Sequence, residues 1–281
     1  MEKRVILAAV VGLFLLSGCK SEFEKIRASG DVELIHRKAR EYFEQGEYQR
    51  AQTLYELVIP AYRGKRELED VYFQYAYTFY HQGKYILANY YFKNFATTFP
   101  NSTHREEAEF MAAYSYYHLS PSFRLDQSYT EKAIEEFQLF VNMYPHSERV
   151  QECNRLIDEM RLKLEQKAFA EAMLYYDLRQ YQAAVVTFEN LLKDFPETRK
   201  AEQVRFMIVK SAYELARNSI YTKQEERYKE VVEYADYYLR KFADGKNQKE
   251  VAAILDGSIQ KLKSLTNGKY RYQDQSTGVG S

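Results

Sequence analysis

The sequence predicts an all-α protein, an α-solenoid of about five helix pairs. Between segment ends, apolar residues recur three and four positions apart, which is the pattern of amphipathic helices. Gly and Pro fall almost entirely at the ends of these segments, where helices start and stop. A motif of aromatic, turn and alanine positions also returns along the chain. Such repetition is typical of a solenoid, in which each repeat buries its apolar face against its neighbours.

The first repeated motif contains an aromatic residue, a turn, a tyrosine, an alanine and a second aromatic or apolar residue. Glycine suits the turn because it adopts a left-handed conformation without strain, and the motif therefore predicts a helix-turn-helix. Gly46 and Gly83 hold this position, whereas Arg179 replaces glycine in the third copy and leaves that turn in question. The motif resembles the 34-residue tetratricopeptide repeat, a pair of antiparallel helices. The stretches that align without gaps are 42–58, 79–95 and 175–191.

A second motif marks the end of each repeat. It consists of an apolar residue, three residues, and then Phe or Tyr followed by proline, which cannot continue a helix. It occurs at 95–100, 140–145 and 191–196, and at 238–243 with Ala243 in place of proline. Each aromatic-proline pair is therefore predicted to end the second helix of a repeat.

These motifs divide the mature chain into N-terminal repeats (32–147) and a C-terminal half (148–265). The C-terminal half contains a helix joining the two halves and a last helix that caps the solenoid. Two repeats are about seven residues longer than the standard spacing, which predicts loops at Ser120–Ser128 and Asn218–Lys223. The tail 266–281, rich in Gly, Gln, Ser and Thr, is expected to be disordered. The expected helix pairs are 32–65, 69–102, 107–147, 165–198 and 205–245.

The N-terminus has the layout of a secretory signal peptide over residues 1–18. Lys3 and Arg4 precede an apolar run that ends at Leu16, too short for a membrane-spanning helix. The segment from Leu16 to Cys19 resembles a lipobox, which predicts a lipid on Cys19 and a polar tether over 19–31. An ordinary signal peptide with a chance cysteine is the alternative.

Charge and composition favour a binding protein without chemistry of its own. Forty basic and forty acidic residues cancel, so no field of one sign is available to attract nucleic acid. We find no phosphate-binding glycine loop, no zinc-type His or Cys spacing and no catalytic constellation, and we predict neither a metal, a cofactor nor an enzyme. Cys153, left alone once Cys19 carries the lipid, is interpreted as a small apolar helix residue.

The concave groove of a solenoid is its expected binding surface. The helix register places Phe73, Tyr77 and Tyr80 of the second repeat there, with Met111 and His118 of the third. Aromatic side chains with scattered polar groups suit an extended or helical peptide. The alternative is that this aromatic stripe is only core. The same register adds Ser115 in the third repeat, His36, Arg40 and Phe43 in the first, and Phe169, Met173 and Tyr176 in the fourth.

A lipobox followed by about five such repeats resembles the BamD family, lipoprotein subunits of the machinery that assembles outer-membrane β-barrels. The resemblance is most specific in the stretches 72–101, 107–118 and 161–196 and in the insertion 124–127. It implies a scaffold on the periplasmic face of the outer membrane that binds unfolded outer-membrane proteins and the barrel-forming subunit BamA, with other lipoproteins of the machinery as further partners. Alternatives are a carbohydrate-capturing lipoprotein of the SusD type, although the chain has no Trp, a cell-envelope organiser, or a cell-wall lyase.

Overall fold

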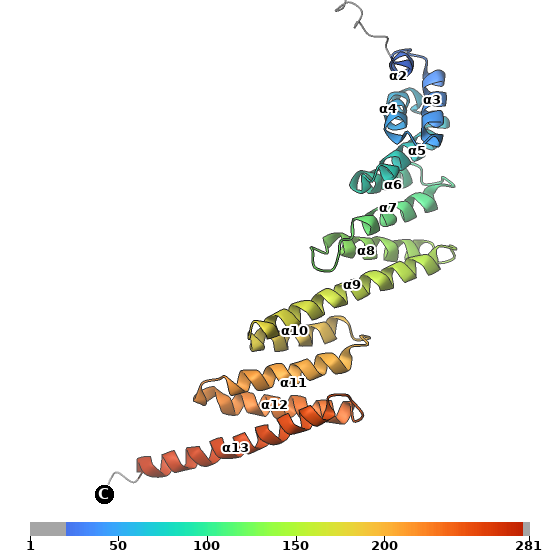
Figure 1. Ribbon diagram of the computed structural model, residues 1–281. Helices are drawn as coiled ribbons and strands as arrows, with labels where there is room; N and C mark the ends of the chain where they lie inside the picture. The colour runs from blue at the N-terminus through green and yellow to red at the C-terminus, as the bar shows by residue number, and fades with distance from the viewer. Residues whose placement is uncertain (1–20, 278–281) are drawn as a thin grey trace, which may run out of the picture. The chain divides into compact units, whose positions relative to one another are not determined.

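The computed structural model describes residues 21–277, with side chains described through residue 267. All regular elements in 21–277 are helices, which confirms the all-α solenoid (Figure 1). Five helix pairs run from α3 to α12. The helices are α2 (Glu22–Arg27), α3 (Val32–Glu44), α4 (Tyr48–Val58), the 3₁₀ helix η1 (Pro60–Tyr62), α5 (Glu67–His81), α6 (Tyr85–Thr98), α7 (Arg105–Leu119), α8 (Ser128–Met143), α9 (Val150–Asp177), α10 (Tyr181–Asp194), α11 (Ala201–Arg217), α12 (Tyr221–Lys241) and α13 (Gln248–Thr277).

The chain forms two compact units whose boundary lies inside α9. Unit 1 contains the residues up to Pro121 and 125–160, and unit 2 contains Ser122–Arg124 and the residues from Arg161 onward. The sequence placed the division between residues 147 and 148. The structure moves it because the first part of α9 buries Cys153, Leu156 and Met160 in the core of unit 1. The predicted joining helix is present as α9, which has 28 residues.

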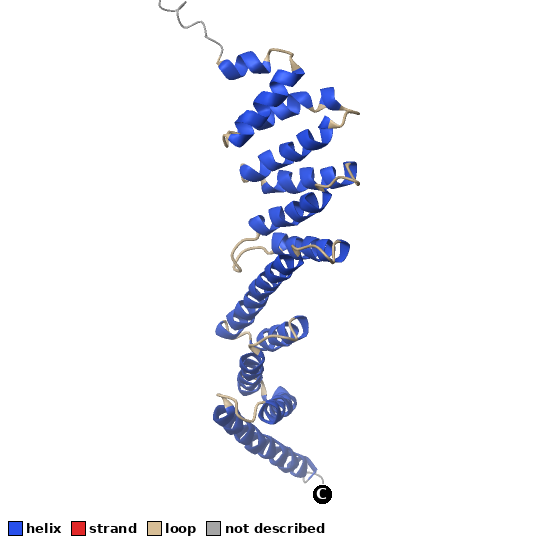
Figure 2. Ribbon diagram, turned by 90° about the vertical axis from the view of Figure 1, so that its right-hand side faces the viewer, coloured by secondary structure: helices blue, strands red, loops and turns tan. Residues whose placement is uncertain are grey.

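Unit 1 is built of antiparallel helices packed in chain order (Figure 2). The motif alanines Ala51 and Ala88 have no exposed surface, so the two helices of each pair approach closely at these positions. Aromatic rings fill the space beside them, and Phe92 and Phe137 are fully buried. Burying one such ring contributes about 1.5–3 kcal/mol relative to leaving it exposed.

Unit 2 repeats this packing with α10, α11, α12 and the second part of α9. Ala184 and Phe188 of α10 are fully buried, as their counterparts in unit 1 are. Helix α13 covers α12, and it contributes Val251 and Leu265 to the core. The capping helix predicted from the sequence is therefore the first part of α13.

The turn inside the helix pair has the same hydrogen bonds in the first, second and fourth repeats. Gly46, Gly83 and Arg179 have φ of 78°, 70° and 59°, in the left-handed region. In the second repeat the Lys84 N–H donates to the Phe79 carbonyl at 2.9 Å and the Gly83 N–H donates to the Tyr80 carbonyl at 2.9 Å. This is the Schellman arrangement, which satisfies carbonyls at a helix end. The turn therefore forms at Arg179 although the sequence lacks glycine there. The arginine adopts a left-handed conformation that suits glycine better.

The turn after the second helix is also uniform. The aromatic residue that caps the second helix has φ between −120° and −126°, and its N–H donates to a carbonyl four residues earlier. This residue is Phe99, Tyr144, Phe195 or Phe242. Ala243 follows Phe242 without changing this geometry. Proline at that position therefore marks the turn but is not required for it.

The predicted polar tether contains a short helix. Ser21 caps α2 by accepting from the Glu24 N–H at 3.3 Å. Ile26 is buried, and the Phe23 ring packs edge-on against Tyr42 at 5.8 Å. Two apolar residues three apart thus attach α2 to the first repeat, and the tether prediction missed them. Cys19 and Lys20 lie outside the described residues.

One of the two predicted long loops is absent. Residues 120–127 form the first loop, whereas only 218–220 separate α11 from α12. The Asn218 amide donates to the Glu214 carbonyl at 2.8 Å and the Gln224 amide donates to the Ser219 carbonyl at 3.0 Å, which closes a short turn. The extra residues instead lengthen α12 to 21 residues, because residues 223–227 are all good helix formers.

The tail also differs from its prediction. Helix α13 continues to Thr277, so residues 266–277 are helical, and 278–281 lie outside the described residues. The segment contains one glycine and no proline, and it extends a helix that is already nucleated. The prediction of disorder was based on composition alone, which does not take into account the part of α13 that precedes these residues.

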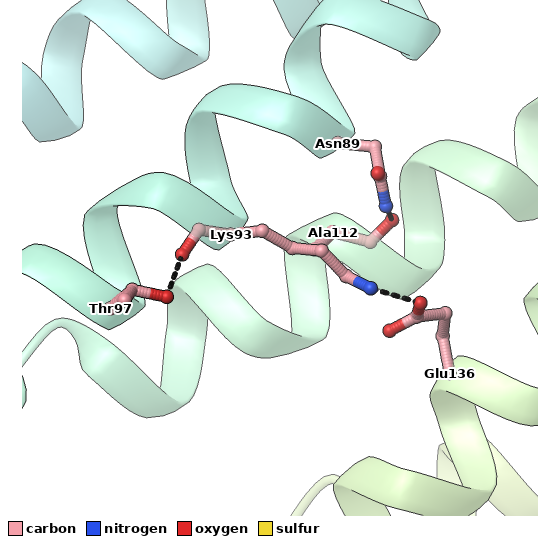
Figure 3. A network of polar contacts seen from close by, with 5 residues as sticks. All are labelled: Asn89, Lys93, Thr97, Ala112 and Glu136. Atoms are coloured by element: carbon pink, nitrogen blue, oxygen red, sulfur yellow. Dashed lines mark hydrogen bonds and ion pairs between the residues drawn. The ribbon is translucent and has the colours of Figure 1, made fainter.

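Polar contacts, one of them buried, join the second and third repeats (Figure 3). The Asn89 side-chain amide donates to the Ala112 carbonyl at 2.9 Å, and Lys93 pairs with Glu136 of α8. Asn89 is almost fully buried, so its amide would be costly to leave without this acceptor. The contacts fix how α6, α7 and α8 lie against one another.

We predict that Arg179→Gly stabilises the protein. A left-handed conformation costs a residue with a side chain about 1–2 kcal/mol, and glycine removes this strain. Part of the gain in stability is lost because the unfolded chain has more conformational entropy with glycine than with arginine. The free energy of unfolding should rise by up to about 1 kcal/mol, measured by urea denaturation. The matched control is Gly83→Ala, where a Cβ meets no atom within 4 Å and only the backbone is strained. This variant should lose stability, and a gain would contradict the explanation.

Candidate peptide-binding surface

Two of the five residues predicted to line the groove lie in the core of unit 1. Phe73 is 5% exposed and its ring packs 5.0 Å from that of Phe95, centroid to centroid. Met111 is 7% exposed. Ser115, from the same predicted face, is fully buried and donates to the Met111 carbonyl at 2.7 Å. These side chains pack the repeats and offer almost no surface to a peptide.

Phe73 occupies a position that recurs in the other repeats. Each such ring faces a cationic or histidine side chain from the turn after the second helix of its repeat. The pairs are Phe73 with His104, stacked at 4.5 Å, Phe110 with Arg149 at 4.3 Å, and Phe169 with Lys200 at 5.3 Å. The aromatic stripe at this position is therefore structural, as the alternative interpretation held.

A glutamate lies four residues before each of these rings. It bonds to a side chain of the turn after the second helix of the repeat. Ser102 donates to Glu69, and the Ser147 hydroxyl donates to Glu106 at 2.5 Å. In unit 2, Glu165 pairs with Lys200 at 3.5 Å. We did not predict these contacts, although the sequence carries their signal. Glutamate precedes the Phe by four residues, and Ser or Thr follows the proline by two.

Tyr77 lies half-buried at the border between core and surface. Its ring packs edge-on against Phe92 at 4.9 Å, and its hydroxyl donates to Glu107 of α7. Burial, and then this carboxylate, raise the pKa of Tyr77, so the hydroxyl stays protonated. The side chain therefore links α5 to α7 and presents part of its ring to solvent.

Tyr80 and His118, both predicted for the groove, contact each other directly. The Tyr80 hydroxyl and His118 Nε2 are 2.9 Å apart, and the Tyr85 ring stacks on His118 at 4.7 Å. Tyr114 packs against both Tyr80, at 6.4 Å, and His118, at 4.7 Å. The second and third repeats thus share one continuous group of rings.

His81 joins the first repeat to this group. Its ring stacks on Tyr48 of α4 at 4.4 Å and on Tyr77 at 5.7 Å. Phe43, predicted from the first repeat, packs edge-on against the same histidine at 5.7 Å. Rings from three helices, α3, α4 and α5, therefore meet around His81.

We call the whole group the tyrosine-histidine surface. Its members lie where the first helix of a repeat ends and the second begins. In the first and second repeats, the left-handed glycine turn places Tyr48 and Tyr85 there. Of these members, the sequence prediction named Tyr77, Tyr80 and His118. It left out Tyr48 and Tyr85 because it considered first helices only, and it did not place His81, Tyr114 and Tyr117 of α5 and α7 on the groove face. The surface consists of Tyr48, Tyr77, Tyr80, His81, Tyr85, Tyr114, Tyr117 and His118.

Burial favours the uncharged form of the two histidines of this surface. Burial lowers the pKa of both His81 and His118 from 6.5. Burial also raises the pKa of Tyr80 to about 12. Tyr117 donates from its hydroxyl to Glu159 at 3.0 Å, which places a carboxylate at the border of the surface. The surface can therefore accept apolar side chains and still offer hydrogen-bonding atoms.

The remaining predicted groove residues lie elsewhere. His36 and Arg40 line a separate hollow of about 360 Å³ in the first repeat, where His36 Nδ1 is 3.1 Å from the Tyr62 hydroxyl. In unit 2, Tyr176 packs edge-on against Tyr181 at 5.6 Å. Met173 and Phe169 pack against the core of that unit.

The described His, Cys, Asp and Glu side chains form no cluster suited to a metal ion, and the free thiol of Cys153 is buried. Among 21–267, no three His, Cys, Asp or Glu side chains gather in a way that could hold a metal ion. Cys153 is fully buried, and burial raises the pKa of its thiol to about 12. A protonated, inaccessible thiol is a poor nucleophile.

Comparison with known protein families gives one match. The family described as YfiO, outer membrane lipoprotein, matches residues 29–222, a range that covers more than half of the chain. The chain belongs to this family. It is the family of BamD-like repeat lipoproteins that the sequence resembled, so the protein is an outer membrane lipoprotein of the barrel-assembly type. The matched range begins just before α3 and ends at the start of α12.

The chain is also similar to solved repeat structures. The TPR2AB domain of yeast Sti1, in its pHSP90 complex, is 12% identical; the match covers 83% of this chain and 100% of that one, with a TM-score of 0.38. A kinesin light chain protein of Podosopora anserina with TPR-like repeats is 16% identical over 85% of this chain and 96% of that one, with a TM-score of 0.33. No curated protein sequence matches.

No helix in the described part of the chain is long and apolar enough to cross a bilayer. The cysteine predicted to carry the lipid, Cys19, lies outside the described residues.

We predict that the histidines of the surface make stability depend on pH. Because the folded pKa values of His81 and His118 lie below 6.5, the unfolded chain binds protons at a higher pH than the folded chain does. Their stabilising contribution is complete above pH 6.5 and is lost as the pH falls through the folded values. The double variant His81→Phe, His118→Phe keeps aromatic stacking and removes the titration.

The free energy of unfolding, measured by urea denaturation, should fall more for the native chain than for this double variant between about pH 7.5 and about pH 5.5. The control His146→Phe changes an exposed histidine on the turn after α8, outside the surface. Equal losses for the native chain and the double variant would contradict the prediction.

Proposed function

We propose that this lipoprotein is a scaffold of the β-barrel assembly machinery. It binds unfolded outer-membrane proteins on the tyrosine-histidine surface and binds the barrel-forming subunit BamA through other parts of the repeats. A lipid on Cys19 holds it at the periplasmic face of the outer membrane. The family match supports the type of machinery, and the structure of unit 1 supports the substrate surface.

The convergence of aromatic rings from three repeats is the observation that carries the substrate assignment. Tyrosine and histidine offer large contact areas with few rotatable bonds, so little side-chain entropy is lost on binding. In unit 1 the rings are already held by one another, as the contacts of His118 with Tyr80 and Tyr85 show. A preorganised surface of this kind loses less conformational entropy when it binds a flexible segment.

The chemistry of the surface fits segments of an unfolded barrel protein. Barrel strands alternate apolar and polar residues and carry aromatic residues near the membrane interfaces. Apolar side chains of such a segment would stack on the exposed parts of Tyr80 and Tyr85. Its backbone and polar side chains would bond to histidine nitrogens and tyrosine hydroxyls. An uncharged surface imposes no charge pattern, which suits many different substrates.

We predict that Tyr80→Ala weakens binding of a peptide that corresponds to a barrel strand and ends in an aromatic residue. Loss of one aromatic anchor should raise Kd about tenfold, measured by fluorescence anisotropy with the mature chain. Tyr80 is preferred to Tyr77, whose half-buried ring also supports the core. His118→Ala should act in the same direction, because it removes the hydrogen bond that positions Tyr80.

Tyr90→Ala is the matched control. Tyr90 is 56% exposed on α6 of the same repeat but is not a member of the surface. Helicity measured by circular dichroism should be the same for all three variants. If Tyr80→Ala and Tyr90→Ala bind the peptide equally well, the substrate does not occupy the tyrosine-histidine surface.

We predict that affinity purification through the mature chain recovers a large barrel protein with periplasmic domains, together with lipoproteins of the machinery. The Tyr80→Ala variant should recover the barrel subunit as well as the native chain does, because its partner surface is separate. Recovery of cell-wall fragments alone would contradict a role in barrel assembly.

A further inference from the structure

The two histidines are the members of the tyrosine-histidine surface that lie most open to solvent. His81 and His118 are exposed, whereas the tyrosines of the surface are partly buried. The ring planes of Tyr48 and His81 are 14° apart, and those of Tyr85 and His118 are 10° apart, so each imidazole stacks on a tyrosine. A segment bound across this surface must therefore cover the histidine rings.

The groups that face the two imidazoles are other aromatic rings. His81 contacts Phe43 of α3, Tyr48 of α4, and Tyr77 and Tyr80 of α5. His118 contacts Tyr80 of α5, Tyr85 of α6, and Tyr114 and Tyr117 of α7.

The carboxylates at the surface bond to tyrosines and not to the histidines. Glu107 accepts from the Tyr77 hydroxyl, and Glu159 accepts from the Tyr117 hydroxyl. Among residues 21–267, neither imidazole forms an ion pair, and burial is the cause that lowers the pKa of both. A protonated histidine at this surface therefore has no fixed negative charge in contact with it.

Hydration supports the charged form of both rings. In the described part of the chain, the hydrogen bond of these imidazoles joins His118 Nε2 to the Tyr80 hydroxyl at 2.9 Å. Nδ1 of His118 and both nitrogens of His81 therefore depend on solvent for a partner. An imidazolium donates from both nitrogens and carries a full charge, so it depends on this solvent more than a neutral ring does.

A bound segment removes much of this hydration. A neutral imidazole offers one donor and one acceptor, which suits a peptide backbone, whereas an imidazolium offers donors only. The apolar side chains of a segment cannot stabilise its charge. The tyrosines stack on the rings with and without a segment, so they do not alter this difference. Covering the rings thus disfavours protonation, and reciprocally protonation weakens binding.

We propose that protonation of His81 and His118 releases a bound segment, so that the tyrosine-histidine surface holds its substrate near neutral pH and releases it in acid. This regulation rests on the function proposed above, because it concerns the same surface and the same substrate. It assigns the tyrosines to contact area and the histidines to the response to pH.

The test compares Kd at about pH 7.5 and about pH 5.5 for the full mature chain. The probe is a peptide of alternating Val and Thr that ends in Phe, with an acetylated N-terminus and an amidated C-terminus, so it does not titrate. Fluorescence anisotropy with a label insensitive to pH should give a Kd at least about threefold higher at the lower pH. Circular dichroism checks that the chain is folded at both.

The possible failures are distinguishable. Equal Kd values at the two pH values would overturn the regulation and leave the proposed substrate surface standing. Absence of binding at both would overturn the substrate surface and the regulation together.

The double variant His81→Phe, His118→Phe identifies the groups responsible. Phenylalanine keeps the stacking but cannot be protonated, so Kd should change with pH less than about 1.5-fold. The matched control His146→Phe removes an exposed histidine outside the surface and should keep the pH dependence of the native chain. A double variant with the same pH dependence as the native chain would show that other groups cause it.

NMR titration of the histidine rings gives a direct measurement without any variant. The mature chain is titrated alone and with saturating peptide. The pKa of His81 and of His118 should each fall further when the peptide is bound, because the remaining hydration is lost. Values that stay the same or rise on binding would overturn the proposal.

Discussion

The helix pairs of the second and fourth repeats are fixed at both ends. At one end a left-handed residue, Gly83 or its counterpart, reverses the chain and satisfies helix carbonyls. At the other end a glutamate such as Glu69 or Glu106 holds the turn that leads to the next repeat. The alanine between these ends sets the helix separation. Tyr48 and Tyr85 each follow a left-handed glycine by two residues, and they stack on His81 and His118 of the next repeat, which produces the tyrosine-histidine surface.

The repeats were predictable because their periodicity, turn glycines and aromatic-proline pairs all indicate the same structure. The errors lie where one local signal was used without its neighbours. Ser21, Phe23 and Ile26 form a capped and packed helix that looked like a polar tether. Residues after 265 continue a helix that composition alone did not reveal. Side-chain bonds of Asn218 and Gln224 shorten a turn whose length had been inferred from spacing.

The candidate site was only partly predictable. Helix register indicates a face, but it does not say how deeply a residue on that face lies, so Phe73 and Met111 were placed with Tyr80 although the core contains them. A comparison of repeats would have separated them, because Phe73 shares its position with Phe110 and Phe169. The meeting of Tyr48 with His81, and of Tyr85 with His118, joins residues from different helices and needs the three-dimensional structure.

The absence of formal charge on the rings has a kinetic consequence. Charged binding sites attract partners over distances comparable with the Debye length, about 8–10 Å at ordinary ionic strengths, and they lose this advantage as salt rises. The tyrosine and histidine rings themselves exert no such attraction, and the carboxylates of Glu107 and Glu159 at the surface each accept from a tyrosine hydroxyl. Under the proposed function, a segment would therefore be retained chiefly by its contact area with the rings. Selection among segments would then occur at the dissociation step.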